Sequence, residues 1–551
     1  MPTSVAAQPL VGKAYLVPML PLAGYAIFLA ESLVVELSPI WAALLLGWAA
    51  AATALAWWLS RGRPASVRLL DRLDRHSATV ALVLILATVL VLVCVNVLQV
   101  RYFSLSVHAE DSAYYNQVLW NTLHGDFLSG NVQQERLFNP PVSTELALHV
   151  SPALLVALLP IYALFPSFLT LLVVRDVMLA AAAWPLFLLA RDRMGGTAGV
   201  AAVTLYLANP AILAQGFQSF SLVLLAPLPF FLALRAFVDE KFGSFVLWTV
   251  VAMCVREDVA IAVAGFGLWA LVGGRGFRWW AAGLGLSVAW WGITTLLIQP
   301  AFGRSGNNVF EMMSTGGRQG PLGIYEMFLL QPSSMLEGLR EGGLHYLYRL
   351  LRSVGFVAIL GWEALLALPG AMANLLLARV FYSGIDPIAR FAVLPSCALV
   401  GAAVAIVTRA ARRRPWDPRV FSLIVLLLLP SVSLVDGAKD AVQDGLLRTG
   451  VRNDRTALRE AVDRIPDGVS VAAPTYALPA LSKRPRLFTL QYLHMYPGAQ
   501  PDYLLLDRNA DRVTGNPELR SRYAALLDKV SRSGEYTTVW QGGEYFLLRR
   551  V

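Results

Sequence analysis

Long apolar runs separated by short polar stretches dominate this chain. Residues 78–100, 279–298 and 420–435 carry almost no charge, and each is long enough, or nearly so, to cross ~30 Å of hydrocarbon. Backbone polar groups in lipid must be satisfied within the segment, which favours helices over isolated strands. The pattern therefore predicts a polytopic α-helical membrane protein.

Basic residues predict how these helices are oriented. They concentrate in short stretches between apolar runs, at residues 61–75, 191–193, 235–241, 275–278 and 409–419, and such stretches usually lie in the cytoplasm. This assignment makes residues 101–149 and 299–345 external loops. It also places the tail from residue 436 outside the cytoplasm.

Interruptions within the apolar runs limit the helix count. Residues 150–190 hold two apolar pieces split at Phe165-Pro166 yet must cross an odd number of times, so one piece is expected to be re-entrant or interfacial. Residues 245–272 and 346–379 are each expected to form two short helices. With two further helices at 14–30 and 40–59, the count is 11 to 14. The predicted units are residues 1–77, with two additional helices and a basic cytoplasmic loop, and a transmembrane domain at 78–435.

The C-terminal part has a different, soluble pattern. Strands are expected at residues 469–473, 486–490 and 502–506, followed by a helix at 517–531 and a hairpin at 536–549 around Gly542-Gly543. Residues 436–551 are therefore predicted to form a small extracytoplasmic α/β domain.

Composition supports the membrane interpretation. Hydrophobic residues make up 57% of the chain and charged residues only 15%, where soluble proteins are nearer a quarter charged. The net charge of +9 lies in inter-helix loops, so it reflects membrane orientation and does not indicate nucleic acid. Cys94, Cys254 and Cys397 lie inside apolar segments, which disfavours a disulfide framework or a cysteine metal site.

The first external loop offers candidate catalytic acids. Glu110 and Asp111 follow a spanning helix and begin a stretch with helical spacing that Gly125 would end. We expect an amphipathic helix on the membrane surface, in which Trp120 could stack on a sugar ring. The alternative for Asp111 is an ordinary helix cap or loop acid.

Two further groups of polar residues could carry chemistry. Arg256, Glu257 and Asp258 interrupt an apolar stretch, where each charge costs ~2.5 kcal/mol or more at a helix centre, so a functional role is favoured over an ordinary turn. His108, His124 and His149 share the external side with Glu110, Asp111 and Asp126, and could hold a divalent ion. Their spacing matches no compact metal motif, which favours ordinary interfacial residues, and no cofactor is assigned.

Several of these stretches together resemble a known family. The run 111–125, then 149–152 with Pro160-Ile161-Tyr162 and Pro166, then 256–258, resembles a family of prokaryotic integral membrane proteins of unassigned function. That family is similar to the GT-C superfamily of glycosyltransferases that use polyprenyl-phosphate sugars. Weaker matches follow at 469–473, at 480–482 with Arg484, and at 501–507. The sequence departs at Phe217-Gln218, where a Phe-His pair is expected, so no role for that histidine is carried over.

The resemblance implies an activity. A sugar would move from a polyprenyl-phosphate donor to an external glycan, lipid or protein acceptor in the plasma (inner) membrane, with Asp111 as catalytic base and Glu110 beside it. Cations would stabilise the leaving phosphate. Arg256 and Arg304 are the first candidates for this role, and Arg318 and Arg349 are the second. The remaining donor-site candidates are Glu257, Asp258, Asn116, Gln117, Trp120 and His149. A transporter or flippase for a lipid-linked or polar solute is the alternative, favoured by the broken segments, and membrane lipids are expected partners under either function.

Overall fold

The computed structural model describes residues 64–98, 109–132, 144–303, 339–377, 390–411, 455–495, 498–509, 513 and 517–551. The helices expected at 14–30, 40–59 and 420–435, and most of the loop expected at 299–345, lie outside these residues. The count of 11 to 14 helices therefore stays a prediction.

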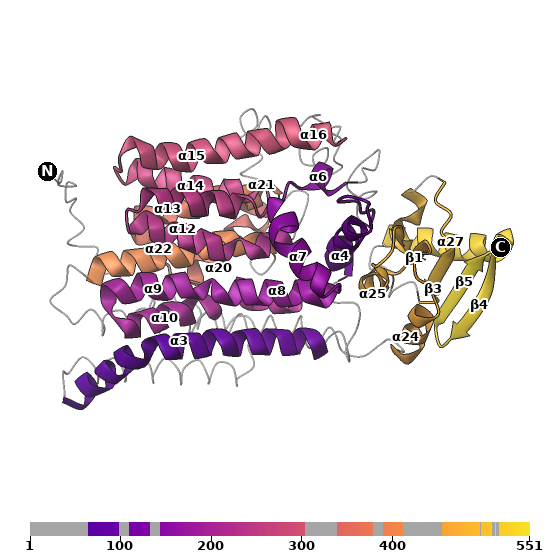
Figure 1. Ribbon diagram of the computed structural model, residues 1–551, viewed down its shortest axis with the longest axis horizontal. Coiled ribbons are helices and arrows are strands. Elements are labelled where there is room, and N and C mark those ends of the chain that lie inside the picture. The colour runs from indigo at the N-terminus through magenta and orange to yellow at the C-terminus, as the bar shows by residue number, and fades with distance from the viewer. Residues whose placement is uncertain are drawn as a thin grey trace.

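A helical part and a smaller sheet domain make up the described molecule (Figure 1). Its main helices are α3 (Pro64–Leu98), α8 (Phe168–Ala181), α9 (Ala183–Met194), α10 (Gly196–Leu207), α12 (Pro227–Val238), α13 (Phe242–Met253), α14 (Val259–Val272), α15 (Phe277–Gly292), α20 (Leu344–Arg352), α21 (Leu368–Leu377) and α22 (Val393–Ala411). Most of them run side by side along the long axis of the molecule.

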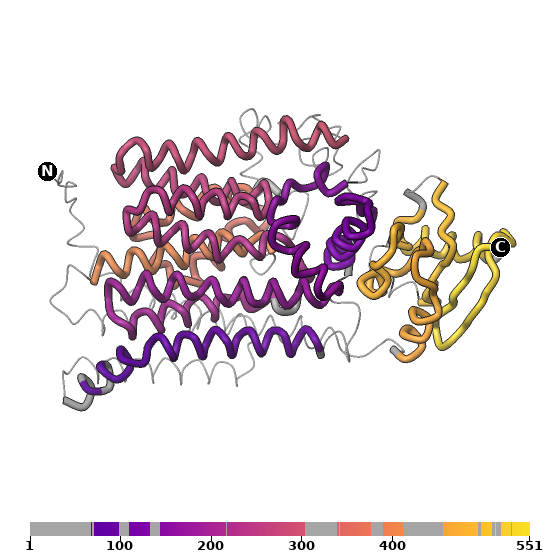
Figure 2. Tube along the Cα trace, in the orientation of Figure 1, coloured from indigo at the N-terminus to yellow at the C-terminus, as the bar shows by residue number. Residues whose placement is uncertain are grey.

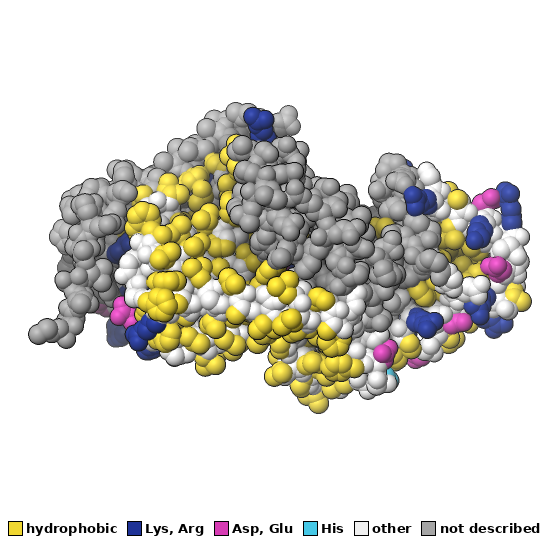
Figure 3. All heavy atoms as spheres, turned by 90° about the horizontal axis from the view of Figure 1, so that it is seen from above, with side chains coloured by type: hydrophobic (Ala, Val, Ile, Leu, Met, Phe, Trp, Pro, Cys, Tyr) yellow, Lys and Arg dark blue, Asp and Glu magenta, His cyan; other side chains and the backbone are white. Residues whose placement is uncertain are grey.

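Four stretches are long and apolar enough to cross a membrane within the described residues. They are Asp71–Val97, Phe168–Met194, Phe277–Ala301 and Arg390–Ala411, the second being α8 and α9 in direct continuation. On the face shown in Figure 3, apolar side chains cover most of the described surface of the helical part, and most visible charged side chains lie at one end of it and on the sheet domain. This distribution is the one expected for a membrane protein.

One expected loop is helical instead. The basic stretch 61–75 was expected to connect two helices, but α3 begins at Pro64 and runs without interruption to Leu98. Proline is well tolerated in the first turn of a helix, and Leu and Arg are good helix formers. The basic residues therefore extend the spanning helix at one end.

The three interruptions expected from the sequence are present. The first apolar piece of 150–190 forms only η4 (Leu154–Leu158) and α7 (Leu159–Leu164), too short to cross ~30 Å. Helices α13 and α14 are separated by residues 254–258, and the stretch after α20 is broken into η9 (Val357–Leu360), η10 (Trp362–Leu366) and α21. These breaks are confirmed.

Glycines allow two close helix contacts. A Cβ on Gly283 of α15 would lie 2.4 Å from the backbone nitrogen of Gly267 in α14, and one on Gly265 would lie 2.2 Å from the carbonyl oxygen of Leu366 in η10. Small residues let helix backbones approach closely in membranes.

Helix α22 lies in the interior of the bundle, with 94% of its most apolar stretch buried.

The sheet domain matches the expectation closely. Strands β1 (Val471–Ala473), β2 (Leu487–Thr489), β3 (Tyr503–Asp507), β4 (Tyr536–Gly542) and β5 (Tyr545–Arg550) form one sheet in the order β2-β1-β3-β5-β4. The first three are parallel and β5 is antiparallel to β3. Helix α27 (Pro517–Ser533) packs on one face, where Tyr523 and Val530 join a core with Leu504. Helices α24 (Arg455–Asp463) and α25 (Leu478–Leu481) complete the domain.

Helix α4 (Ala109–Leu123) lies between the two parts (Figure 2). It ends near Gly125, whose φ of 95° suits glycine, as expected. The helix does not lie exposed on a membrane surface, however, because residues 112–119 are all buried. Helices α7 and α8 cover it on one side and α25 covers it on the other, so its polar side chains face protein.

Candidate functional site

Asp111 lies in the first turn of α4 and contacts Ser219 and Arg390. The Ser219 hydroxyl donates to its Oδ2 over 3.1 Å, and Arg390 forms an ion pair with the same oxygen. An acidic side chain in the first turn also suits the helix dipole. The Asp111 side chain remains 16% exposed and that of Arg390 31%, so a small group could reach both.

Glu110 shares this first turn and lies near enough for its charge to act on Arg390. Arg390 comes from η12 (Arg390–Ala392), directly before α22. Two acids and one arginine therefore gather where the first turn of α4 meets the segment directly before α22.

His149 and Glu257 form a second charged group with Arg256 and Asp258. The loop between α13 and α14 carries the last three, and Arg256 binds Asp258 through both carboxylate oxygens, with 2.7 Å from Nε to Oδ1. Glu257 accepts from the backbone N–H of Val150 over 3.0 Å and lies 2.8 Å from Nδ1 of His149. His149 and Glu257, 108 positions apart in the sequence, thus belong to one cluster.

Charge pairing sets the protonation of this cluster. Burial alone would raise the pKa of Glu257, but His149 and then Arg256 lower it below its usual range. Burial would lower the pKa of His149, but the Glu257 carboxylate outweighs it and raises this pKa. Burial likewise opposes the charge of Arg256, yet Asp258 raises its pKa. The cluster is therefore best described as two ion pairs.

Glu145 is a third acid, which the sequence did not single out. It begins α6 (Glu145–Leu148), is 1% exposed and accepts a hydrogen bond from Tyr114 of α4. Its Oε1 atom is buried without a hydrogen-bond partner among the described residues. Burial raises the pKa of Glu145 to about 7, against a smaller opposing effect of His149.

The Asp111 group and the cluster around Glu257 are neighbours. Tyr115 of α4 experiences the charges of Glu145, Arg256 and Glu257, and its ring packs edge-on against Phe220 at 5.4 Å between centroids. Phe220 directly follows Ser219, the partner of Asp111. One aromatic contact therefore separates the Asp111 group from the cluster around Glu257.

Asn116 and Gln117 have other partners. Asn116 donates to the Ser482 hydroxyl over 2.7 Å and accepts from Tyr162 over 2.8 Å. Gln117 donates to the carbonyl oxygens of Arg484 and Pro485 and to Asn131. Both are buried and connect α4 to the sheet domain, so the structure does not bring them to Asp111.

Trp120 stacks on His124, with 3.9 Å between ring centroids, and it is partly buried. Arg349 lies in the last turn of α20. Arg304 and Arg318, as well as His108, lie outside the described residues. Among the residues that are described, no group of three or more His, Cys, Asp or Glu side chains could hold a metal ion.

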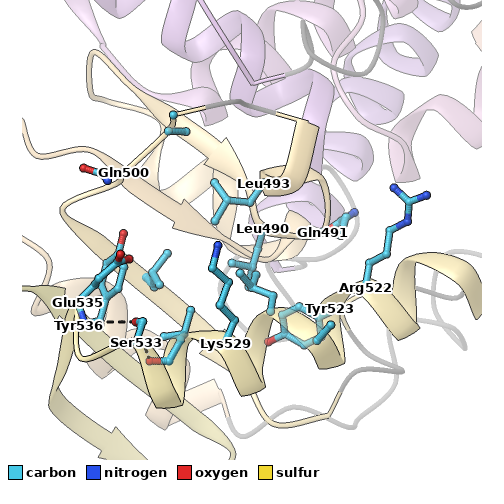
Figure 4. A pocket seen from close by; sticks show the side chains of 16 residues that line it. Leu490, Gln491, Leu493, Gln500, Arg522, Tyr523, Lys529, Ser533, Glu535 and Tyr536 are labelled. Carbon is cyan, nitrogen blue, oxygen red and sulfur yellow. Dashed lines mark hydrogen bonds between the residues drawn. The ribbon is translucent and has the colours of Figure 1, made fainter.

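A cleft of about 470 Å³ lies elsewhere, between α27 and the loops that follow β2 (Figure 4). Arg522, Lys529 and Glu535 line it together with Tyr523 and Tyr536. None of the residues predicted from the sequence lies there.

The residues that sequence reasoning missed differ in the signal they leave. Arg175 and Asp176 are fully buried in α8, and a charged pair inside an apolar run is a visible signal. Ser219, Arg390 and Glu145 carry no local signal, because each gains its role only through a partner distant in sequence.

The fold and composition define an integral membrane protein with a small α/β domain. The chain belongs to the family described as predicted membrane protein (DUF2079), whose sequence profile matches residues 101–547. This confirms the family resemblance expected from the sequence. No curated protein matches the chain.

Solved structures of ArnT and of an oligosaccharyltransferase match the chain at low sequence identity. ArnT from Cupriavidus metallidurans bound to undecaprenyl phosphate is 14% identical with a TM-score of 0.45, over 85% of this chain and 98% of that one. The apo state of ArnT gives the same identity and TM-score over 86% and 98%. The Archaeoglobus fulgidus oligosaccharyltransferase in its apo form is 12% identical with a TM-score of 0.37, over 80% and 72%.

Proposed function

We propose that this chain is a membrane glycosyltransferase that moves a sugar from a polyprenyl-phosphate donor to an acceptor, with Asp111 as the catalytic base. The observation that carries the proposal is the pairing of the partly exposed Asp111 carboxylate with Arg390 and Ser219. An acid and a cation side by side are what this transfer requires, because one group takes a proton while the other stabilises a developing anion. The family resemblance of the stretch that holds Asp111 supports the same activity.

The reaction follows from these two groups. The acceptor hydroxyl oxygen attacks the anomeric carbon, a new C–O bond forms, and the bond from that carbon to the phosphate oxygen breaks. The electron pair of the broken bond stays on the polyprenyl phosphate, and the hydroxyl proton passes to Asp111. Atoms and charges balance without a further reactant.

Arg390 is the cation that we assign to the donor phosphate. Arg256 is already bound to both oxygens of Asp258, whereas Arg390 is 31% exposed. A phosphate beside Asp111 would draw the guanidinium toward itself. The carboxylate would then be available to the acceptor hydroxyl, so that donor binding prepares the base. The cluster of His149, Glu257 and Arg256 would orient the sugar.

The basic stretches between helices support a membrane orientation in which these stretches face the cytoplasm. The protein would lie in the plasma membrane as a multi-pass protein, with Asp111 and the C-terminal domain on the extracytoplasmic side. Its acceptor would be a glycan, a lipid or a protein, and membrane lipids would surround the helices. Nucleic acid is not a partner.

Transfer in proteoliposomes tests the proposal. Purified protein receives a panel of polyprenyl-phosphate hexoses and pentoses with a radiolabelled sugar, together with glycolipid and glycan acceptors from the native envelope. Asp111→Asn is expected to abolish transfer while leaving the melting temperature in detergent unchanged. Asp126→Asn is the matched control, because Asp126 is exposed just beyond α4. Full transfer by Asp111→Asn would refute the role of Asp111.

A transporter or flippase is the second candidate, and the breaks around residues 254–258 and 361 favour it, because interrupted helices often line transport sites. Movement of a lipid-linked sugar across liposome membranes without any covalent product would establish this function in place of sugar transfer.

A further inference from the structure

A buried ion pair in α8 lies close to the Asp111 group. Arg175 and Asp176 are both 0% exposed. They lie about 10 Å along α8 from Phe168, the first residue of this helix, since an α-helix rises about 1.5 Å per residue. Charges inside an apolar spanning segment are costly and are retained mainly where they serve a function. The reaction proposed above does not use either residue.

The bonds of this pair join three segments. Arg175 donates from Nε and Nη2 to Asp176 Oδ1 over 3.0 and 2.8 Å, and Asn96 of α3 donates to Asp176 Oδ2 over 2.6 Å. The remaining guanidinium nitrogen, Nη1, donates to the backbone carbonyl of Gln218. The pair therefore attaches the segment at Gln218 to both α3 and α8.

This segment reaches Asp111. Ser219 directly follows Gln218 and donates to Asp111, and the backbone N–H of Phe220 donates to Ser112 over 3.0 Å. Residues 218–221 lie between η5 (Ala214–Phe217) and η6 (Leu222–Leu225) and form no regular structure. A segment without its own backbone ladder takes its position from such contacts.

We infer that Arg175 and Asp176 are positioning residues that hold Ser219 against the Asp111 carboxylate. This inference rests on the proposed function for its kinetic consequence. Ser219 and Arg390 approach the same Asp111 oxygen from different segments, so the direction of the carboxylate depends on both. Loss of the Arg175 bond to Gln218 would loosen Ser219 and weaken its hold on the Asp111 carboxylate, while the Arg390 ion pair remains.

The test replaces the ion pair as a unit. Arg175→Met together with Asp176→Leu removes both charges, and replacing a buried ion pair by apolar side chains is often neutral for stability. The matched control replaces a second ion pair of the helical part, Arg409→Met with Glu363→Leu, in which the Glu363 side chain is 5% exposed and that of Arg409 32%. Arg409 lies about 28 Å from Arg390 along α22 at 1.5 Å per residue, and Glu363 is its partner at 2.8 Å.

Two readouts are compared. In the Arg175/Asp176 double variant, kcat is expected to fall at least about tenfold, since a misplacement of ~1 Å can cost ~100-fold, with KM for the donor little changed. The same replacement in a Ser219→Ala background should produce almost no further loss. Replacement of the control pair should leave kcat within about twofold of the unmodified protein, which corresponds to a change of less than ~0.5 kcal/mol in activation free energy.

The second readout does not need activity. Ser219→Cys is introduced into a chain whose three native cysteines are alanine, and its labelling by a membrane-impermeant maleimide is timed. Ser219 is partly exposed, and labelling should become several-fold faster when Arg175 and Asp176 are replaced. Unchanged labelling together with unchanged kcat would overturn the inference. Faster labelling in a protein that transfers no sugar would uphold the positioning role and refute the proposed function.

Discussion

Glu145 should make the protein less stable as pH rises through the weakly acidic range. Its carboxyl group is 1% exposed, its Oε1 atom has no partner among the described residues, and burial raises its pKa from 4.5 to about 7. Between these two values the folded protein binds a proton that the unfolded chain has lost, so stability falls as pH increases.

The size of this effect follows from the pKa. The pKa of Glu145 differs by about 2.5 between the unfolded and the folded protein, which corresponds to about 3 kcal/mol of unfolding free energy over the full pH range. About 2 kcal/mol of this loss falls between about pH 5 and 6.5. His149 also has a raised pKa, so its stabilising charge is lost in the same direction. Most of that loss falls above its ordinary pKa of 6.5, so the window from about pH 5 to 6.5 reports mainly on Glu145.

Glu145→Gln separates this cause from others. Glutamine keeps the shape and can still accept the hydrogen bond from Tyr114, but it cannot ionise. Thermal unfolding in a neutral detergent, followed by tryptophan fluorescence, should show the melting temperature falling from about pH 5 to 6.5 in the unmodified protein and nearly constant in the variant. Glu460→Gln, at an exposed acid of α24, should retain the fall. An equal fall in Glu145→Gln would show that burial of this carboxyl group is not its cause.

Three further outcomes are expected. Gly283→Ala should destabilise the α14–α15 contact by about 1–3 kcal/mol, because its Cβ would lie 2.4 Å from Gly267, whereas Gly285→Ala meets no atom within 4 Å and should melt like the unmodified protein; equal melting of both would contradict the contact. Asn116→Ala breaks buried bonds to Ser482 and Tyr162 and should cost about 1–3 kcal/mol, seen as faster proteolysis of the sheet domain, while Gln541→Ala at an exposed position should not. Arg390→Gln should raise KM for the donor by about 10- to 100-fold, the equivalent of a charged hydrogen bond of about 1.5–3 kcal/mol, with partial recovery in Arg390→Lys; an unchanged KM would exclude Arg390 from the phosphate site.

Elements with a regular hydrophobic pattern could be predicted from the sequence. The strands near residues 471, 487 and 503, the helix from Pro517 and the break at 254–258 all have local signals, and the structure has each of them. The extension of α3 back to Pro64 was missed, because charge alone suggested a loop although those residues are good helix formers.

The candidate site could be predicted only in part, because it is assembled from distant segments. Asp111 and Glu257 were singled out, but Arg390 lies 279 positions after Asp111 and acquires meaning only through the ion pair. Asn116 was assigned to the donor site with the resemblance of the stretch 111–125, yet helical geometry turns it toward Ser482. A linear sequence does not show which side of α4 faces the C-terminal domain.

The burial of α22 separates Arg390 from the lipid around the protein. In the described bundle, 94% of the most apolar stretch of this helix is buried, compared with 17% for α3 and 22% for the stretch that contains α15. A helix that contacts lipid can tilt when bilayer thickness changes, and α3 and α15 are open to that response. Helix α22 is held by protein instead. The depth of Arg390 beside Asp111 should therefore stay the same in thin and thick membranes, and hydrophobic mismatch would be accommodated at the periphery of the bundle.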